Sequence, residues 1–450
     1  MATSDLDITS SLPTNVAIED DYVTRVAPVR SLDNHGPLEF FVEPSATDLT
    51  HITEHFLKIS VCAKRNNKPV KHVKALTDSH REDPSSIDFN ATGTAAGAPD
   101  EDAKLSCNNN LVGSLFSQCS IYFNNVLIEN VTDYAFISYL TTLLGYDKDA
   151  KTSALEYLVG WYEDKPGAFN LDTNPAFQKR IRYLLLNGRE CHLKCKLALG
   201  ITHMHRFIPN HISIKIVLHR KKPEFAFQFL GLESAKPAGE YTLEITRATF
   251  EVRRVKVLPS VLQNYEEQLS KELGQFPFKR LQCRAFNLQK DQTDVTLQNM
   301  FSGELPSSVL ICMVPNSTYN GDLYSNSYNL EHLDLGKAAL YANGKEFPTH
   351  GYEINMKKHD YADAYLSLFT GFSQFHSITR EEFSKGSFML YFDMDPSGDE
   401  LVSSMPNGVV SGKFTFNTEL AKTTTLLAIA SFNVKLFIDH MRNFTFTYTP

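Results

Sequence analysis

The sequence carries a weak internal duplication, and this repeat constrains the possible fold more than any other feature. Residues 121–125 (Ile-Tyr-Phe-Asn-Asn) and 340–344 (Leu-Tyr-Ala-Asn-Gly) both look like a strand that runs into a tight turn, and Asn-Gly is a strong hairpin signal. Each is followed by a segment with helical spacing, residues 139–146 and 365–372. Because the same order occurs twice, we expect two copies of one structural unit.

Two further pairs extend the repeat. Pro209-Asn210 and Pro406-Asn407 each precede a strand-like run, and residues 248–253 and 430–435 share one alternating pattern. The spacing between matching segments drifts, as expected when two copies of a β fold carry loops of different length. We therefore predict an all-β fold of two tandem eight-stranded jelly rolls with a few short helices in the loops. This class protects its edge strands by packing two sheets face to face.

Alternation of apolar and polar residues with a period of two supports the β prediction. It is found in residues 57–62, 193–199, 212–218 and 432–448. In residues 241–257 the apolar phase slips twice, which predicts β-bulges in a long strand or a pair of strands.

Helical spacing is limited to a few segments. We predict helices near residues 134–144, 153–162 and 174–186. The clearest prediction is residues 261–273, with Pro259-Ser260 before it and a glycine after it. We interpret this last helix as a connector between two β-rich halves.

These patterns divide the chain into three parts. We predict a flexible N-terminal arm over residues 1–20, a first jelly roll over 21–258 and a second over 259–450. Residues 78–104 are rich in Asp, Ser, Ala, Gly and Pro, so we expect a surface loop there.

Length and composition agree with this division. A chain of 450 residues accommodates two large all-β domains. The 44 Lys and Arg residues against 52 Asp and Glu give a net charge of −8, which argues against a nucleic-acid coat built on basic patches. The many aromatic residues, 31 Phe and 19 Tyr with one Trp, favour strands over a helical bundle. The composition excludes a wholly disordered chain, collagen and a coiled coil.

Cysteine usage and hydropathy indicate a compartment. The seven cysteines are an odd number with no Cys-x-x-Cys motif, so we expect a reduced intracellular protein. The polar, acidic first residues do not resemble a signal peptide, and we expect no membrane span because no long apolar run occurs.

One cluster has the residue types of a metal site: Cys191, Cys195, His203 and His205. We predict that it is structural, because the two cysteines share the phase of Leu193 as core residues would. The His-x-His pair also lacks the nearby carboxylate and the glycine spacing that a cupin-type metal site requires. A metal-dependent jelly-roll enzyme using the two histidines is the weakest of our three hypotheses.

Other charged clusters are short, and we expect them to be ordinary solvated surface, capable at most of weak contact with DNA or an acidic neighbour. They are Arg220-Lys221-Lys222, Arg253-Arg254, Lys357-Lys358, Asp20-Asp21 and Glu266-Glu267. The sequence contains no G-x-S-x-G, Walker, G-x-G-x-x-G or H-E-x-x-H motif. We therefore predict no enzymatic activity and assign no catalytic, cofactor-binding or metal-binding residue.

Several segments of the chain resemble the major capsid proteins of Maverick/Polinton-type elements and adintovirus-like viruses. The most specific is residues 114–125, which begin Ser-Leu-Phe-Ser-Gln. The others are residues 36–40, 139–151, 253–257, 259–262, 277–283, 301–306, 320–321 and 340–344. The resemblance extends from about residue 20 to about residue 375, and residues 78–104 form a longer insertion than the family pattern suggests.

The resemblance implies a double jelly-roll protomer that forms homotrimeric, pseudo-hexagonal capsomers, which tile an icosahedral shell around double-stranded DNA. It implies self-association, contact with a minor or penton capsid protein, weak non-specific contact with packaged DNA, and a place in the virion capsid after assembly inside the host cell. The alternative is a β-sandwich binding module without a capsid role, for example for glycans. Such a module needs exposed aromatic rings, for which Tyr319, Tyr324 and Tyr328 are the candidates.

Overall fold

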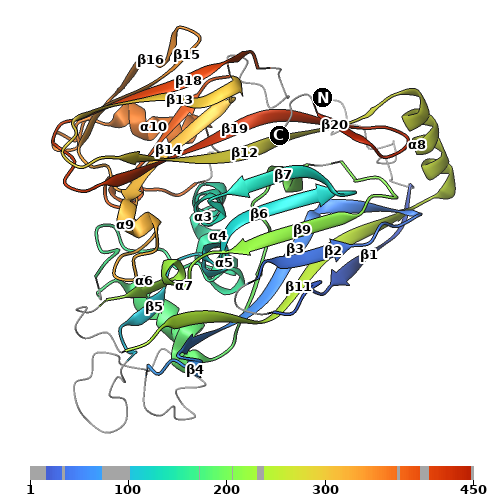
Figure 1. The fold of residues 1–450 in the computed structure, drawn as a ribbon, viewed down its shortest axis with the longest axis horizontal. Helices are drawn as coiled ribbons and strands as arrows, with labels where there is room; N and C mark the ends of the chain where they lie inside the picture. Colours follow the sequence, from blue (N-terminus) through green and yellow to red (C-terminus); the bar gives the residue numbers. More distant parts are fainter. Residues whose placement is uncertain are drawn as a thin grey trace, which may run out of the picture.

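The computed structural model describes residues 17–32, 36–72, 102–171, 173–204, 206–230, 238–371, 376–395 and 405–446. Its strands form two stacked groups, one from each half of the chain, with helices gathered beside and between them (Figure 1). Each group contains two antiparallel sheets. The predicted fold class, two tandem jelly rolls, is confirmed.

The first roll has one sheet in the order β1-β11-β3-β8 and a second in the order β2-β9-β6-β7. Strand β4 pairs with the end of β3 in the first sheet, and β5 pairs with β10 in a separate ribbon. The strands are β1 (Ile18–Val26), β2 (Leu38–Val42), β3 (Asp48–Arg65), β4 (Lys68–Pro69), β5 (Leu105–Cys107), β6 (Phe116–Phe123), β7 (Val126–Thr132), β8 (Cys191–Cys195), β9 (Ile214–Arg220), β10 (Phe227–Phe229) and β11 (Tyr241–Val257).

The second roll repeats this arrangement. Its sheets have the orders β12-β19-β14-β17 and β13-β18-β15-β16, so the main strands of each roll follow the orders 1-8-3-6 and 2-7-4-5. The strands are β12 (Gly274–Leu288), β13 (Asp294–Glu304), β14 (Ser308–Pro315), β15 (Leu335–Ala342), β16 (Lys345–Glu353), β17 (Met389–Asp393), β18 (Asn407–Phe416), β19 (Thr424–Ile438) and β20 (Phe444–Phe446).

The sequence repeat corresponds to this shared topology. The first pair of segments ends β6 and β15, the fourth strand of each roll, and the helical pair falls in the connection after the fifth strand. Pro209-Asn210 precedes β9 and Pro406-Asn407 leads into β18, whose first residue is Asn407, and the last pair lies within β11 and β19. All four matches therefore occupy equivalent places in the two rolls, and only Phe372 of the second helical segment lies outside the described residues.

The two matching hairpins have the same backbone geometry. Asn124 and Asn125 have φ of 44° and 66°, and Asn343 and Gly344 have φ of 48° and 77°. Positive φ at both central residues is the signature of the type I′ turn, whose twist suits a two-residue hairpin. Asparagine and glycine tolerate this region of backbone space, so the sequence itself specifies these turns.

The predicted strands are largely confirmed. β11 shows register shifts between Ile245 and Arg247 and between Val252 and Arg253, which are the two predicted irregularities. The strand predicted over residues 193–199 is too long, because β8 ends at Cys195. Leu197 and Leu199 are buried all the same, since the chain continues along the core in irregular form.

The helices are α2 (Leu111–Ser114), α3 (Tyr134–Gly145), α4 (Lys148–Lys151), α5 (Ala154–Leu158), α6 (Pro175–Arg180), α7 (Pro223–Ala226), α8 (Pro259–Lys271), α9 (Asn316–Tyr319), α10 (Ala362–Gly371) and α11 (Arg380–Ser384). Short η segments are η2 (Ile181–Leu185), η3 (Leu186–Gly188) and η4 (Gly200–His203). Helix α8 connects β11 to β12 at one end of the molecule (Figure 1).

Two helix predictions are wrong in extent. The helix predicted over 153–162 stops at Leu158, because Gly160 takes a φ of 73° and redirects the chain. The helix predicted over 174–186 is α-helical only to Arg180 and then widens into a π-turn. The connector prediction for 261–273 is confirmed as α8, but Leu273 lies beyond the helix and is exposed.

The domain division remains a prediction. Among the described strands every pairing stays within residues 18–257 or within 274–446, which fits the predicted units 21–258 and 259–450. Strand β1 begins at Ile18, so the last residues of the predicted arm (1–20) already belong to a sheet. Residues 73–101, most of the predicted loop, lie outside the described residues.

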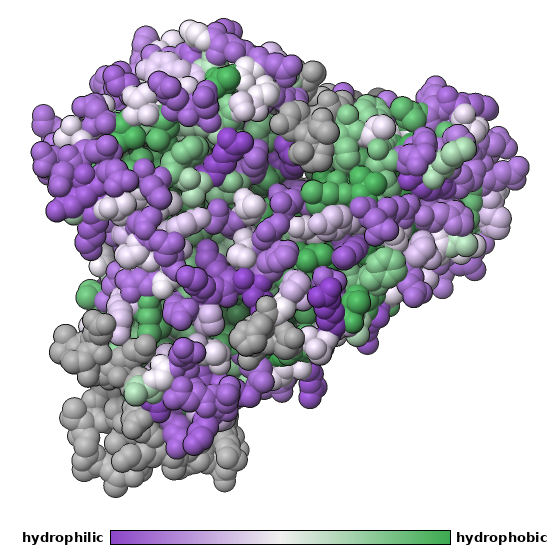
Figure 2. All heavy atoms as spheres, in the orientation of Figure 1, coloured by the Kyte–Doolittle hydropathy of each residue, from purple (hydrophilic) through white to green (hydrophobic). Residues whose placement is uncertain are grey.

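One apolar core runs through both rolls and the helices between them. Most of the face shown in Figure 2 is hydrophilic, and hydrophobic residues reach the surface along the band between the two rolls. Within the described part of the chain, no helix is both long and apolar enough to cross a bilayer.

Candidate functional site: the joint between the two rolls

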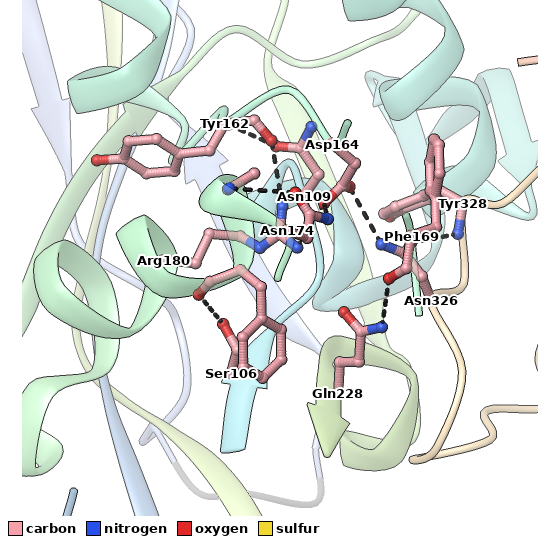
Figure 3. Close-up of polar contacts among 12 residues, drawn as sticks. Ser106, Asn109, Tyr162, Asp164, Phe169, Asn174, Arg180, Gln228, Asn326 and Tyr328 are labelled. Carbon is pink, nitrogen blue, oxygen red and sulfur yellow. Dashed lines mark hydrogen bonds and ion pairs between the residues drawn. The ribbon is translucent and has the colours of Figure 1, made fainter. Parts of the chain in front are cut away.

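Polar side chains are buried and hydrogen-bonded to one another where loops of the two rolls meet (Figure 3). At its centre Arg180 Nη2 lies 2.8 Å from Asp164 Oδ1, and both side chains are almost inaccessible to solvent. A buried ion pair is tolerated only when further hydrogen bonds satisfy both groups.

The remaining bonds come from both rolls. Asn174 Nδ2 donates to Asp164 Oδ1 at 2.7 Å, and Arg180 Nη1 donates to the Tyr162 carbonyl at 3.1 Å. Asn326 Nδ2, from the loop that follows α9 in the second roll, donates to Asp164 Oδ2 at 3.1 Å. An ion pair of the first roll is thus completed by a side chain of the second.

The same loop is fixed by further bonds. Asn326 N donates to Asn170 Oδ1 at 2.7 Å, and Tyr328 N donates to Asn326 Oδ1 at 2.9 Å. Asn108 Nδ2 of the first roll donates to Ser327 Oγ at 2.9 Å. A buried hydrogen-bond network of this kind favours one arrangement of its parts.

Aromatic rings surround the network. The Tyr328 ring stacks on Tyr139 of α3 with centroids 4.1 Å apart, and Phe136 packs against Tyr319 and Phe225. Tyr328 is fully buried. The glycan-platform hypothesis is therefore wrong for this residue.

The other two tyrosines of that hypothesis are also engaged. Tyr319 Oη donates to Asp133 Oδ1 at 2.8 Å, and the half-buried Tyr324 packs edge-on against Phe229. All three rings hold the second roll against the first, and they form no exposed platform.

Lys221 belongs to this aromatic cluster. Its ammonium lies 3.7 Å from the centroid of Phe225 and 5.5 Å from that of Tyr319. Burial lowers the pKa of Lys221 to about 8, although the charge of Asp133 acts in the opposite direction. The prediction that residues 220–222 are ordinary surface is wrong here, because Lys221 spans the joint.

A second contact between the rolls centres on Glu129 of β7. Its carboxylate accepts hydrogen bonds from Gly200 N and Ile201 N of η4, each at 3.0 Å, and from Leu281 N of β12 at 3.4 Å. Burial raises the pKa of Glu129 to about 7, while these donors and Arg280 oppose the rise. Glycine is required at 200, since a Cβ there would lie 1.7 Å from the Lys279 carbonyl oxygen.

A third contact involves Lys151 of α4. Its ammonium donates to the Leu143 carbonyl at 2.8 Å and to Ser377 Oγ of the second roll at 3.4 Å, and it lies 3.7 Å from Glu163. Burial lowers the pKa of Lys151.

The described members of the metal-like cluster lie on different elements. Cys191 and Cys195 lie on β8 and pair with β3, and burial raises the pKa of the Cys191 thiol to about 11 and of Cys195 to about 12. His203 is exposed on η4, and His205 lies outside the described residues. No group of three or more His, Cys, Asp or Glu side chains suited to a metal ion occurs among the residues that the structure describes.

The remaining charged clusters differ in burial and in their partners. Arg254 is buried and donates to Thr50 Oγ1 at 2.6 Å, which contradicts the surface prediction. Arg253 pairs with Asp21 at the surface, and Lys357 pairs with Asp334. Of the acidic pairs, Glu266 contacts Arg442.

Sequence reasoning missed Asp164, Arg180, Glu129 and Lys151. Of these four, only Glu129 could have been noticed in the sequence, because an acidic residue follows the apolar residues at the start of β7 directly after Ile128. The others depend on contacts between distant segments, which no local pattern reveals.

No family model matches the chain. One curated protein and several solved structures are similar to it. The chain is 20% identical over 351 residues to the uncharacterized protein F54H12.2 of Caenorhabditis elegans, a match covering 74% of this chain and 80% of that protein.

Solved structures match almost the whole chain. The Faustovirus major capsid protein aligns with a TM-score of 0.60 at 9% identity, covering 95% of this chain and 92% of that one. A chain of the Sputnik virophage aligns with a TM-score of 0.62 at 10% identity, covering 99% and 92%. The mavirus major capsid protein aligns with a TM-score of 0.53 at 11% identity, covering 99% and 94%. At these identities the likeness establishes the shared fold.

Proposed function

We propose that this chain is the major capsid protein of a Maverick/Polinton-type (adintovirus-like) element, and that its homotrimers are pseudo-hexagonal capsomers. The capsomers tile an icosahedral shell around double-stranded DNA. The observation that carries the proposal is the identical strand order of the two rolls together with the buried joint that fixes one against the other.

Symmetry explains why this observation matters. Two similar rolls side by side give one protomer two of six roughly equivalent corners, and a threefold axis completes the ring with closed, heterologous contacts. Such a ring approximates a hexagon only if every protomer holds its two rolls at the same angle. The angle between the rolls is fixed by the buried ion pair, the stacked tyrosines and the Glu129 contact.

The fold likeness to the capsid proteins of Faustovirus and mavirus supports a capsid role. The sequence resemblance supports the more specific Maverick/Polinton assignment. We include in the proposal the domain division at 258 and 259, self-association as the main interaction, contact with a minor or penton capsid protein, and a final location in the virion capsid after assembly inside the host cell.

Contact with packaged DNA is weak in this proposal. The net charge is −8, and several basic residues are used within the fold, including Lys221 and Arg254. A shell that does not grip DNA through many Lys and Arg contacts avoids a steep dependence of assembly on salt. The proposal assigns no enzymatic activity and no cofactor to the chain.

Size-exclusion chromatography with light scattering tests the proposal. We expect a stable particle of three times 50.8 kDa at micromolar concentration. A strict monomer under the same conditions would contradict the capsomer proposal.

A further inference from the structure

A cavity of about 760 Å³ lies between the two rolls. It is a half-open space walled by α3 of the first roll, by η4 and the residues after it, and by β12, β14, β17 and β19 of the second roll. Ligand pockets are commonly about 300 to 1,000 Å³, concave and lined mainly by apolar groups. The cavity matches that description in both size and lining.

Its wall is apolar over most of its area. Leu140 and Leu144 line it from α3, Phe278 and Leu281 from β12, and Leu310 and Ile429 from the sheet of the second roll. A ligand that brings apolar surface into this space gains by removing both surfaces from water.

The basic side chains among the described lining residues come from adjoining segments. They are His203 and Arg206, in and after η4, and Lys279 of β12. The η4 region and β12 are in direct contact here. Arg206 Nη1 donates to the Gln275 carbonyl of β12, and Gly200 packs closely against the Lys279 carbonyl. None of the described lining residues is Asp or Glu.

One acidic side chain lies near these basic residues. Asp393 of β17 interacts electrostatically with Lys279, but it does not line the cavity. Arg206 retains binding capacity because a guanidinium carries five N–H donors and one bond to Gln275 does not use them all.

We propose that this cavity binds a long-chain fatty acid, with the hydrocarbon tail against α3 and the second-roll sheet and the carboxylate at Arg206 and Lys279. A hydrocarbon tail needs no hydrogen-bond partners. A peptide segment would bring backbone N–H and C=O groups that an apolar wall cannot satisfy. The site is formed by a single chain, so the inference does not depend on shell assembly.

The test is binding of a fluorescent stearic acid derivative to the purified full-length protein. We expect saturable binding of one probe per chain, displaced by palmitate and much less by hexadecanol, which lacks the carboxylate. No saturable binding, or equal displacement by the alcohol, would overturn the proposal. Binding seen only with phosphatidylcholine–phosphatidylserine vesicles would point to a bilayer and would overturn it as well.

Two variants localise the site. Thr141→Trp fills the cavity from the half-buried face of α3, and we expect about tenfold weaker binding at an unchanged melting temperature. Lys279→Gln removes one exposed charge, and we expect roughly three- to tenfold weaker binding of the acid with no change for the alcohol.

The matched control is Lys290→Gln, an exposed lysine in the turn after β12 that does not line the cavity. Wild-type affinity in Thr141→Trp, or equal losses in both lysine variants, would contradict the placement. A protein that forms trimers but binds no fatty acid would refute this inference alone. A monomer that binds the fatty acid would refute the capsomer proposal alone.

Discussion

The ring of Tyr139 in the first roll lies face to face with the ring of Tyr328 in the second, with 4.1 Å between centroids and 5° between planes. Trp161 stacks on the same Tyr139 at 5.2 Å, so the contact between the rolls continues into the core of the first. A side chain from residue 328 is thus part of the interior built by residues 139 and 161. The two rolls share a core and cannot be pulled apart without exposing it.

Tyr328→Ala is expected to lower the free energy of unfolding by about 3 to 5 kcal/mol, because it leaves a large cavity beside the Tyr139 ring. Chemical denaturation followed by near-UV circular dichroism measures the loss. Tyr341→Ala is the matched control, since Tyr341 is exposed on β15 and its removal costs about 0.5 kcal/mol or less. Equal effects of the two substitutions would show that the stack does not couple the rolls.

The ion pair at the joint gives a second prediction. Arg180→Met leaves the Asp164 carboxylate buried without its partner, and we expect a loss of about 3 to 5 kcal/mol. Adding Asp164→Asn to this variant should recover part of the loss, because the uncompensated charge is removed. The free energies of unfolding of the two single variants and the double variant measure the coupling.

Lys385→Met is the control for the ion pair. Lys385 forms an exposed pair with Glu381, and we expect less than about 1 kcal/mol for its removal. If the double variant is no more stable than Arg180→Met, the buried Asp164 charge does not cause the loss of stability in Arg180→Met.

The contact at Glu129 predicts a pH dependence. Its pKa is about 7 in the folded protein against 4.5 for an ordinary glutamate, so the folded state binds the proton more tightly. The resulting stabilisation is complete below about pH 4.5 and is lost as the pH rises through about 7, by up to about 3 kcal/mol.

Glu129→Gln should remove this dependence. The difference in unfolding free energy between wild type and variant, measured from pH 4.5 to 8, should shift against the wild type as the pH rises. Glu267→Gln, at an exposed position of α8, serves as the control and should show a constant difference. A pH-independent difference for Glu129→Gln would contradict the placement of a titrating carboxyl at this contact.

Phe116 tests whether residues 114–125, the segment most similar to the capsid proteins, form a strand that faces the core. Its side chain is fully buried and packs edge-on against Tyr134 with 6.5 Å between centroids. Phe116→Asp puts an unpaired charge into the core, so we expect no folded trimers. Val126→Asp changes a partly exposed residue on the neighbouring strand and should leave the melting temperature nearly unchanged. Normally folded trimers of Phe116→Asp in light scattering would show that the strand is misassigned.

Local patterns predicted the sheets well. The hairpin turns at Asn124 and Asn343 depend on residues that tolerate positive φ, and the bulges of β11 leave a visible slip of the apolar phase. The repeat was detectable because both rolls need the same turn and strand residues at equivalent places.

The joint was not predictable in the same way. Asp164 and Asn326 are 162 residues apart, and each is an ordinary polar residue in its own segment. Tyr328 looked like an exposed ring for the same reason, because its partner Tyr139 is supplied by the other roll. Contacts made only by the assembled fold leave no periodic signal in the sequence.

Single-particle electron microscopy of the purified particle tests the central claim most directly. Class averages viewed along the symmetry axis should show a closed ring of six lobes, two from each of three chains. A ring of three lobes, an open chain of protomers, or two rolls at variable angles would contradict the account.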